Sequence, residues 1–351
     1  MFEEVMKQSG FWTSTGPFSH IVLSSRIRLA RNMQSIPFPN RLISEDMYAI
    51  RDAIERFAHE SAYRDHVSII ELKSIDSNEK RFLRERNVIT YEMEVSDNSL
   101  VAVDHTDNFT ILVNEEDHFR IQVIRPGLQL MEAYKIADRV DTELNRFAAY
   151  AFSEELGYLA TCTSNLGTGL RVSVLLHLPV LTIKNALHDL IPEEKKRAVE
   201  LKGTIGPSTK TLGSLYLLSN RLSLGPSEVD IIETLDDVLG GILESEDTGR
   251  DEYFSESRLE LEDRIWRSYG LLQFSRRMSY IESMDHLSNL RLGIILAIIK
   301  NCDVKALNDL MVNIQWAHLQ RQYGLLFKST NECDEYRADY IRKNFHAFEV
   351  K

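Results

Sequence analysis

The chain has 351 residues, of which 43% are hydrophobic and 27% are charged, a composition typical of a globular protein. Its 53 acidic side chains outnumber the 41 Lys and Arg residues and give a formal net charge of -12, which excludes a general binder of nucleic acid or of anionic membranes. The three cysteines lie far apart and form no CxxC pair, so neither a disulfide framework nor a cysteine zinc site is predicted.

The sequence carries no targeting signal and no membrane-spanning segment. The first residues are acidic and lack the apolar stretch of a signal peptide, and the longest apolar run, residues 292–299, is too short to cross a bilayer. Cysteines that do not pair fit a reducing compartment. These features predict a cytoplasmic protein that binds neither membrane nor nucleic acid.

The first elements expected along the chain are a strand and a helix. Residues 20–31 alternate between two faces, which predicts a strand that carries Arg26 and Arg28 on one of them. Ser44 then precedes an acidic first turn and an amphipathic pattern over residues 47–58. This combination is typical of a capped helix.

A β-rich region follows. Short runs with β propensity, separated by Asp-Asn turns, lie at residues 88–94, 100–103 and 109–113. Residues 118–125 alternate again, so the side chains of Glu116, His118 and Arg120 are expected on one face of a strand. The middle of the chain is therefore predicted to be a β-meander with chemistry at one of its turns.

Helices and strands then alternate. A helix is predicted over residues 130–151. Two strand-like runs, 157–162 and 170–178, flank a loop rich in Gly, Ser, Asn and Thr and are expected to pair with each other. A helix near residues 181–201 and a strand at 214–219 follow, before a helix that starts at Ser227. Strands separated by long helices predict an α/β (α+β) sheet protein.

The length exceeds the usual ~100–200 residues of one domain, so a second unit is expected. The most charged stretch, residues 244–256, is nearly devoid of apolar side chains and is the candidate linker. Beyond it the periodicity is helical throughout. We therefore predict a catalytic domain over residues 1–245, a linker over 246–256 and an all-helical domain over 257–351.

Cationic side chains are expected on strand faces or in adjacent loops. They are Arg26, Arg28, Arg31, Arg120, Arg171 and Lys202. If the sheet brings them together, their mutual repulsion would be relieved by a polyanion such as a nucleoside triphosphate. The alternative is that each cation pairs with a local acid, such as Asp46 or Glu115, or lies solvated.

The turn at residues 114–118 concentrates three carboxylates between two strands. They are suited to position a substrate, bind Mg²⁺ or accept a proton, although an acidic surface turn is the alternative. His105 and His118 lack the spacing of a zinc hydrolase, and no metal site built from protein ligands alone is predicted.

Cys162 precedes the glycine-containing loop and lies near Arg171 in sequence. A thiol beside cations would favour the thiolate form, and a buried structural cysteine is the alternative. The loop itself fits neither the dinucleotide-binding nor the P-loop pattern.

Three segments together resemble a known family. They are Ser24-Ser-Arg-Ile-Arg-Leu-Ala-Arg-Asn32 with Ile36-Pro-Phe-Pro39, Asn114-Glu-Glu-Asp-His-Phe-Arg120, and Thr161-Cys-Thr-Ser-Asn-Leu-Gly-Thr-Gly-Leu-Arg171 followed by His177-Leu-Pro179. In order and spacing they resemble the signature blocks of the phosphagen (guanidino) kinases. The position of the first block and the helical C-terminal part are similar to the bacterial protein-arginine kinases within that family.

The resemblance implies a glutamine-synthetase-like catalytic domain, with an antiparallel sheet flanked by helices, and a C-terminal all-helical domain. It assigns Glu116 to the guanidinium as its binding and deprotonating carboxylate, places Cys162 beside it as the active-site thiol, and implies ATP and Mg²⁺. The residues that it places around ATP are Ser24, Ser25, Arg26, Ile27, Arg28, Asn87, Arg120, Arg171, Val172, Ser173, Val174, Leu175, Lys202, Gly203, Thr204, Ile205, Gly206 and Pro207.

The chain departs from the family pattern at several positions. In the fourth block Lys202 replaces an arginine and Pro207 replaces a second catalytic glutamate, while Asn87 stands where the family has a nucleotide-contacting histidine. A lysine binds phosphate only as a point charge. Near the C-terminus, Asp334 and Arg337 match part of a phosphoarginine-binding motif, RDxxRA, whose first arginine is Cys333 here.

Two functions remain open at this point. In the first, the chain uses ATP to phosphorylate arginine side chains of proteins in protein quality control, with Glu116 alone handling the guanidinium. In the second, it is a weak or inactive pseudokinase that binds ATP or phosphoarginine-bearing proteins as an adaptor for a Clp-type protease. The close match of the remaining blocks favours the enzyme. The resemblance also implies protein substrates with exposed arginine, a zinc-binding activator protein, a Clp-type unfoldase and a homodimer as partners.

Overall fold

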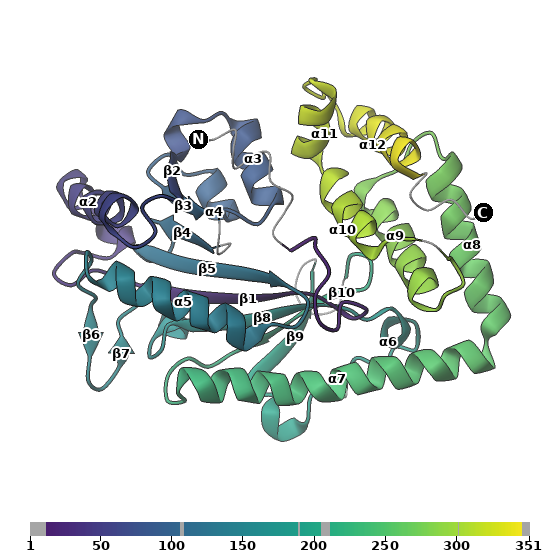
Figure 1. The fold of residues 1–351 in the computed structure, drawn as a ribbon, viewed down its shortest axis with the longest axis horizontal. Helices are drawn as coiled ribbons and strands as arrows, with labels where there is room; N and C mark the ends of the chain where they lie inside the picture. The colour runs from purple at the N-terminus through teal and green to yellow at the C-terminus, as the bar shows by residue number, and fades with distance from the viewer. Residues whose placement is uncertain (1–11, 106–108, 189, 205–210, 301, 346–351) are drawn as a thin grey trace.

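A computed structural model describes residues 12–105, 109–188, 190–204, 211–300 and 302–345. Its centre is an eight-stranded sheet in the order β2-β3-β4-β5-β1-β8-β10-β9, and each pair of neighbours is antiparallel (Figure 1). The strands are β1 (Val22–Arg31), β2 (Val67–Glu71), β3 (Leu100–Asp104), β4 (Phe109–Val113), β5 (Phe119–Pro126), β8 (Leu170–His177), β9 (Val199–Gly203) and β10 (Leu215–Asn220). A small separate hairpin consists of β6 (Phe152–Ser153) and β7 (Gly157–Tyr158).

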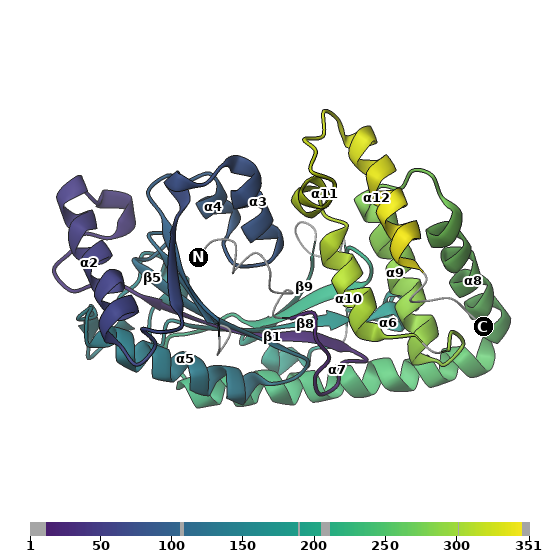
Figure 2. The ribbon, with the colours of Figure 1, turned by 45° about the horizontal axis from the view of Figure 1, so that its top comes forward.

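Two long helices, α5 (Leu130–Asn145) and α7 (Glu228–Glu256), cover one face of this sheet (Figure 2). Alternate side chains of the central strands point toward them, and those of Ile27, Val172 and Val174 are fully buried. Each such side chain contributes about 1.5–3 kcal/mol relative to an exposed one. The sheet is therefore anchored from one side, which leaves its other face available for a site.

Most of the remaining helices lie around the opposite face (Figure 2). On the N-terminal side these are α3 (Ser77–Glu85) and α4 (Tyr91–Glu94), whereas α2 (Ser44–Glu60) packs beside α5 in the core of the first face. On the C-terminal side, beyond the short α6 (Pro179–Ile183), they are α8 (Arg258–Phe274), α9 (Tyr280–Ile295), α10 (Val304–Asn313), α11 (Trp316–Tyr323) and α12 (Thr330–Asn344). The predicted antiparallel sheet flanked by helices, with a helical C-terminal part, is confirmed.

The β-meander is confirmed except for its first run. Residues 88–94 form no strand: Asn87 ends the preceding helix with φ of +60°, and the Thr90 side chain accepts a hydrogen bond from Met93 N that begins α4. The first strand of the meander is instead β2, Val67–Glu71, which pairs with β3. The β propensity of residues 88–94 is thus overridden by local capping.

Two expectations for the middle of the chain are wrong. Only Gly157 and Tyr158 of the run 157–162 are β-structure, and they pair with β6 rather than with β8. The helix expected near residues 181–201 is limited to α6, because Val199–Gly203 pairs with β10 as the edge strand of the sheet. In both cases the pairing of strands in the folded protein, and not the local sequence pattern, determines the secondary structure.

The candidate linker over residues 246–256 is not a linker in conformation. It is the second half of α7, which runs unbroken to Glu256. The charged composition of this segment does not mean that it is exposed throughout. The carboxylate of Glu246 is fully buried and accepts hydrogen bonds from the backbone N–H groups of Val180 and Leu181 at the start of α6. The domain boundaries that we placed on either side of this segment remain predictions.

Within the described ranges, the structure contains no helix that is both long enough and apolar enough to span a membrane.

Candidate active site

Strand β1 is the centre of the site because it lies between β5 and β8. On its open face, Arg28 is opposite Gln122 of β5 and Arg171 of β8. One step along the same face, Arg26 is opposite Ser173, and its Nε donates to the Ser173 Oγ at 3.2 Å. The alternation seen in the sequence therefore brings arginines of separate strands together, as predicted.

The Arg26 and Arg28 guanidinium groups are poorly compensated. Burial, reinforced by the charges of Arg120 and Arg171, lowers the pKa of Arg26 to about 10. Burial and the neighbouring Arg26, Arg120 and Arg171 also lower the pKa of Arg28 well below its ordinary value, opposed only by Glu115. The buried Nε of Arg28 has no hydrogen-bond partner. Such a cluster is costly unless an anion binds it.

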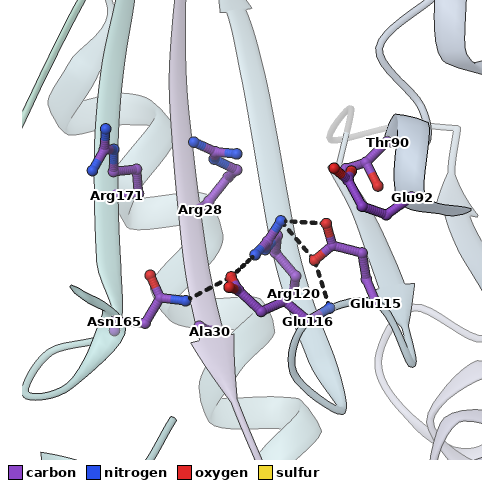
Figure 3. Close-up of a pocket in the computed structure, with 10 residues that line it drawn as sticks. Arg28, Ala30, Thr90, Glu92, Glu115, Glu116, Arg120, Asn165 and Arg171 are labelled. Atoms are coloured by element: carbon purple, nitrogen blue, oxygen red, sulfur yellow. Dashed lines mark hydrogen bonds and ion pairs between the residues drawn. The ribbon is translucent and has the colours of Figure 1, made fainter. Parts of the chain in front are cut away.

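A cavity of about 500 Å³ opens over these arginines, and Figure 3 shows the side chains around it. Cations from three neighbouring strands share it with carboxylates from the turn between β4 and β5 and from α4. The lining residues are Arg28, Ala30, Thr90, Glu92, Glu115, Glu116, Arg120, Asn165, Gly169 and Arg171. Its size suits a ligand as large as a nucleotide.

Part of the cationic charge is neutralised within the chain. Arg120 forms ion pairs with Glu115 at 2.7 Å and with Glu116 at 2.8 Å (Figure 3). Arg171 donates to Glu200 at 2.7 Å and to the Ser219 Oγ at 3.1 Å. The alternative of pairing with acidic side chains thus holds for Arg120 and Arg171, whereas Arg28 has no carboxylate at ion-pair distance among the described residues.

Glu116 lies at the mouth of the cavity. Its side chain is 41% exposed, compared with 4% for the adjacent Glu115. Besides Arg120, its Oε2 accepts a hydrogen bond from Asn165 Nδ2 at 3.2 Å. This carboxylate is therefore both held in place and accessible, as a group that binds a substrate must be.

The Cys162 thiol lies beside the site rather than among the cavity's lining residues. Its Sγ is 3.1 Å from the Ser164 Oγ, at the start of the short 3-10 turn Thr163–Asn165. That turn places the Asn165 side chain within hydrogen-bonding distance of Glu116. The thiol is partly exposed, so the alternative of a buried structural cysteine is wrong.

Four of the residues expected around ATP point away from the open face. The side chains of Ile27, Val172 and Val174 lie in the core, and the Ser25 hydroxyl donates to the Gly127 carbonyl and accepts from Gln129 N. These expectations are corrected for the side chains, because a strand sends consecutive residues to opposite faces. Ser24, Arg26, Arg28, Arg171, Ser173 and Leu175 alternate with them, although Leu175 packs against an apolar cluster.

The other expected nucleotide contacts lie at the edges of the site. The Asn87 carbonyl accepts a hydrogen bond from Gln122 Nε2 at 2.8 Å, next to Arg28. Lys202 is exposed on β9, with its Nζ 2.8 Å from Glu200. Gly203 ends β9, and the Thr204 hydroxyl accepts from Leu212 N. Ile205, Gly206 and Pro207 lie outside the described residues.

Arg31 does not join the anion site. It is buried on the other face of the sheet, where it forms an ion pair with Asp141 at 2.7 Å and lies 3.6 Å from the centre of the Tyr158 ring. It also donates to the carbonyl groups of Ala30 and Thr168. Its pKa is raised because Asp141 outweighs the effect of burial. Arg31 is a structural residue that holds the loop before β8.

The expected phosphoarginine site at Asp334 and Arg337 is closed. Arg337 is buried and donates to Asp334, to the carbonyls of Ile314 and Met278, and to the Cys333 Sγ. In this conformation the Arg337 guanidinium is occupied by these partners, and phosphoarginine binding by Asp334 and Arg337 stays a prediction. Cys333, at the position of the missing arginine, belongs to the same packed cluster.

Several residues of the site escaped the sequence analysis. Asn165, Gly169 and Thr90 carry no charge, and Glu92 belongs to a segment expected to be a strand. Glu200 accepts from Arg171 and Lys202; burial would raise its pKa, but these cations hold it below its usual range. Only its alternation with Lys202 on an edge strand could have indicated it.

No preformed metal site is found. No group of three or more His, Cys, Asp or Glu side chains in the described part of the chain is arranged to hold a metal ion. The buried His118 accepts from Met33 N through Nδ1 and lies 2.9 Å from the Pro37 carbonyl through Nε2, so it is a neutral structural residue. Burial lowers its pKa.

Comparison with known families gives the class of protein. A model of the ATP:guanido phosphotransferase C-terminal catalytic domain matches residues 49–249, and a model of the protein-arginine kinase McsB C-terminal domain matches residues 258–351. Fold and site thus correspond to an ATP:guanido phosphotransferase. Two curated relatives are the protein-arginine kinases of Bacillus subtilis (strain 168), 38% identical over 96% of this chain and 93% of the relative, and of Symbiobacterium thermophilum, 37% identical over 97% of each. The chain belongs to the protein-arginine kinase family.

Solved structures agree on the fold. The substrate-free duplicated taurocyamine kinase from Schistosoma mansoni superposes with a TM-score of 0.58 at 24% identity. The match covers 76% of this chain, which spans 40% of that duplicated enzyme. Lombricine kinase gives a TM-score of 0.58 at 22% identity, covering 69% of each chain.

Proposed function

We propose that this chain transfers the γ-phosphoryl group of ATP to arginine side chains of proteins. The observation that carries the proposal is the juxtaposition, in one cavity, of under-compensated arginines with the exposed carboxylate of Glu116. The arginines match a polyphosphate, and the carboxylate matches a guanidinium. The relationship to protein-arginine kinases supports a protein as the acceptor.

The arginines supply the electrostatic part of the reaction. Arg26, Arg28 and Arg171 would bind the phosphate chain, and the charge that develops in the transition state would be stabilised by the same groups. Arg171 must then exchange its pairing with Glu200 for the nucleotide. Lys202, linked to the same glutamate, adds a point charge rather than a bidentate fork.

Glu116 handles the acceptor. A guanidinium is protonated at neutral pH and is a poor nucleophile, so a fixed carboxylate must orient one nitrogen toward phosphorus. As the N–P bond forms, the bond between the γ-phosphorus and the bridging oxygen breaks, ADP leaves, and Glu116 accepts the guanidinium proton. Most of the rate arises from positioning, which is consistent with activity despite Pro207.

Mg²⁺ fits this site as a companion of ATP. Glu92, Glu115 and Glu116 line the same cavity as the arginines and offer the oxygen ligands that Mg²⁺ prefers. Since no three-ligand protein site is preformed within the described residues, the ion would be held mainly by phosphate oxygens and water. Bound there, it would neutralise phosphate charge.

The expected partners remain proposals. An apolar stripe on α8, formed by Leu259, Trp266 and Phe274, is 81%, 40% and 67% exposed and lies on one side of the helix. This stripe supports a homodimer through the helical part. The family relationship supports a cytoplasmic role in protein quality control, with proteins bearing exposed arginine as substrates and a zinc-binding activator and a Clp-type unfoldase as partners.

The test uses the purified chain with γ-labelled Mg-ATP and an unfolded arginine-rich protein. We expect acid-labile label on the acceptor, lost by at least about 10³-fold in Glu116→Gln. Glu115→Gln is the matched control: its side chain is buried against Arg120, so we expect reduced but measurable transfer. An absence of acid-labile product above the Glu116→Gln background, with ATP still bound, would instead support the adaptor function.

A further inference from the structure

The carboxylate of Asp117 is the most deeply buried acidic group of the β4–β5 turn, and its side chain does not line the cavity. Asp117 is 0% exposed, in contrast to its neighbour Glu116. Its Oδ1 accepts hydrogen bonds from Asn32 Nδ2 and from Thr161 N, both at 2.7 Å. Its Oδ2 accepts from Asn165 Nδ2 at 3.2 Å. Both oxygens are thus used inside the protein, which rules out contact with substrate or metal in this arrangement.

The three donors come from two segments, the end of β1 and the loop that carries Cys162. Asn32 follows the end of β1, where its Oδ1 also accepts from His118 N at 2.9 Å. Thr161 is the residue before Cys162, and Asn165 is in the turn after it. The Asn165 amide donates at the same time to the Glu116 Oε2. The Asp117 carboxylate is therefore the common centre of the arginine-bearing strand, the Glu116 turn and the Cys162 loop.

We propose that Asp117 is a positioning residue for phosphoryl transfer, acting through Asn165 on Glu116 and through Thr161 N on the backbone at Cys162. The proposal rests on the proposed function. Since a reactive geometry must be held within a fraction of an ångström, displacement of Glu116 by about 1 Å costs about 10²-fold in rate. Nucleotide binding depends on the arginines and is left intact.

The chemistry of the centre requires a carboxylate. Three N–H donors converge on Asp117, and a carboxylate has no proton of its own to place against them. In Asp117→Asn one amide N–H faces a donor. If the Asn165 amide turns to relieve this, its oxygen is directed at the Glu116 carboxylate, and repulsion replaces the hydrogen bond. The isosteric change thus transmits an effect to Glu116 without altering the volume of the core.

The experiment compares Asp117→Asn, Asn165→Ala and the double variant with the wild-type chain. We expect kcat to fall about 10²-fold in Asp117→Asn, while the Kd for Mg-ATP changes by less than about threefold. The double variant is no worse than Asp117→Asn alone, since both changes interrupt the same connection to Glu116.

A merely structural role gives different results. The proposal is overturned if Asp117→Asn retains wild-type kcat per ATP-binding site, or if the losses of the two single variants multiply. Equal losses of ATP binding and of kcat, following a loss of folded protein, overturn it as well.

A second readout separates this proposal from the proposed function. The rate of Cys162 alkylation by iodoacetamide is measured in a Cys302→Ser background, where Cys333 is buried. We expect Asp117→Ala to raise this rate at least about fivefold, because the Thr161 N–H before Cys162 loses its acceptor, even if the wild-type chain forms no phosphoarginine. An unchanged alkylation rate overturns the positioning role, whereas absent transfer in the wild type overturns only the proposed function.

Discussion

Arg28 and Arg171 occupy directly opposite positions in the register of β1 and β8, so two like charges face each other across neighbouring strands. Such pairs destabilise a sheet. The proximity of Arg171 contributes to lowering the pKa of Arg28. Arg171 itself forms an ion pair with Glu200. The nucleotide-free site therefore contains charge repulsion between arginines, which a bound anion would relieve. This repulsion has a measurable effect on the free energy of unfolding.

Replacing Arg28 with Met removes a poorly compensated cation. We expect Arg28→Met to raise the free energy of unfolding of the nucleotide-free protein by about 1–2 kcal/mol and to weaken Mg-ATP binding by at least about 10²-fold. Denaturant unfolding with and without Mg-ATP measures both effects, because a ligand that binds only the folded state stabilises it.

Arg31→Met on the same strand is the matched control. Arg31 is paired with Asp141, so its removal leaves a buried carboxylate alone and is expected to cost about 3–5 kcal/mol. A destabilised Arg28→Met protein that still binds ATP normally would contradict our account of the anion site.

Glu85 connects α3 with α11. Its carboxylate accepts hydrogen bonds from the backbone N–H groups of Ala317 and His318 and pairs with the His318 Nδ1 at 2.9 Å. We expect Glu85→Ala to cost about 2–4 kcal/mol, since a helix N-terminus loses its acceptor. Hydrogen exchange should accelerate in both α3 and α11. Glu335→Ala, at an exposed position of α12, should change stability by less than about 0.5 kcal/mol; protected amides in α11 of the Glu85 variant would argue against the connection.

His177 makes stability depend on pH. It is buried and hydrogen-bonded to the Ser288 Oγ at 2.7 Å, and burial together with Arg291 and Arg250 lowers its pKa well below its ordinary value. Below about pH 6.5 the unfolded chain binds a proton at this residue that the folded chain does not. The contribution of His177 therefore falls by up to about 1.4 kcal/mol per pH unit as the pH decreases.

The measurement for His177 is the difference in unfolding free energy between the wild type and His177→Gln at pH 7.5, 6.5 and 5.5. This difference cancels other titrating groups, including Glu246, whose pKa is raised by burial to about 7 and which acts in the opposite direction. We expect the difference in unfolding free energy between the wild type and His177→Gln to decrease steadily below pH 6.5. A difference that stays constant would mean that the folded protein protonates His177.

Arg337 is expected to behave as a core residue. Arg337→Gln leaves Asp334 buried without its cation and should cost about 3 kcal/mol in the stability of the helical part. Free phosphoarginine at millimolar concentration should leave the Tm of the wild type unchanged. A rise in Tm for the wild type that is absent in Arg337→Gln would show that the cluster opens to bind it.

The sequence sufficed for the arginine face but not for the whole site. Alternation alone placed Arg26 and Arg28 on one side of a strand, and the signature segments indicated that Arg120 and Arg171 would join them. The partners of each strand could not be read in this way, because the pairing of β1 with β5 and β8 joins residues at least 88 positions apart. Glu200 belongs to the site only through the pairing of β9 with β10, and Asn165 only through its hydrogen bonds to the β4–β5 turn. Asp117 looked like one more acid in a polar turn.

The continuity of α7 changes how the two parts of the molecule can move. At 29 residues it is a rod of about 43 Å, with one end beneath the sheet and the other at the helical part (Figure 1). Its charged second half cannot serve as a swivel without breaking successive backbone hydrogen bonds. The weakest stretch is Gly240-Gly241, where each glycine costs about 1 kcal/mol relative to alanine. Any rocking of the helical part against the sheet would therefore bend the rod at its middle, underneath the strands that carry the arginines.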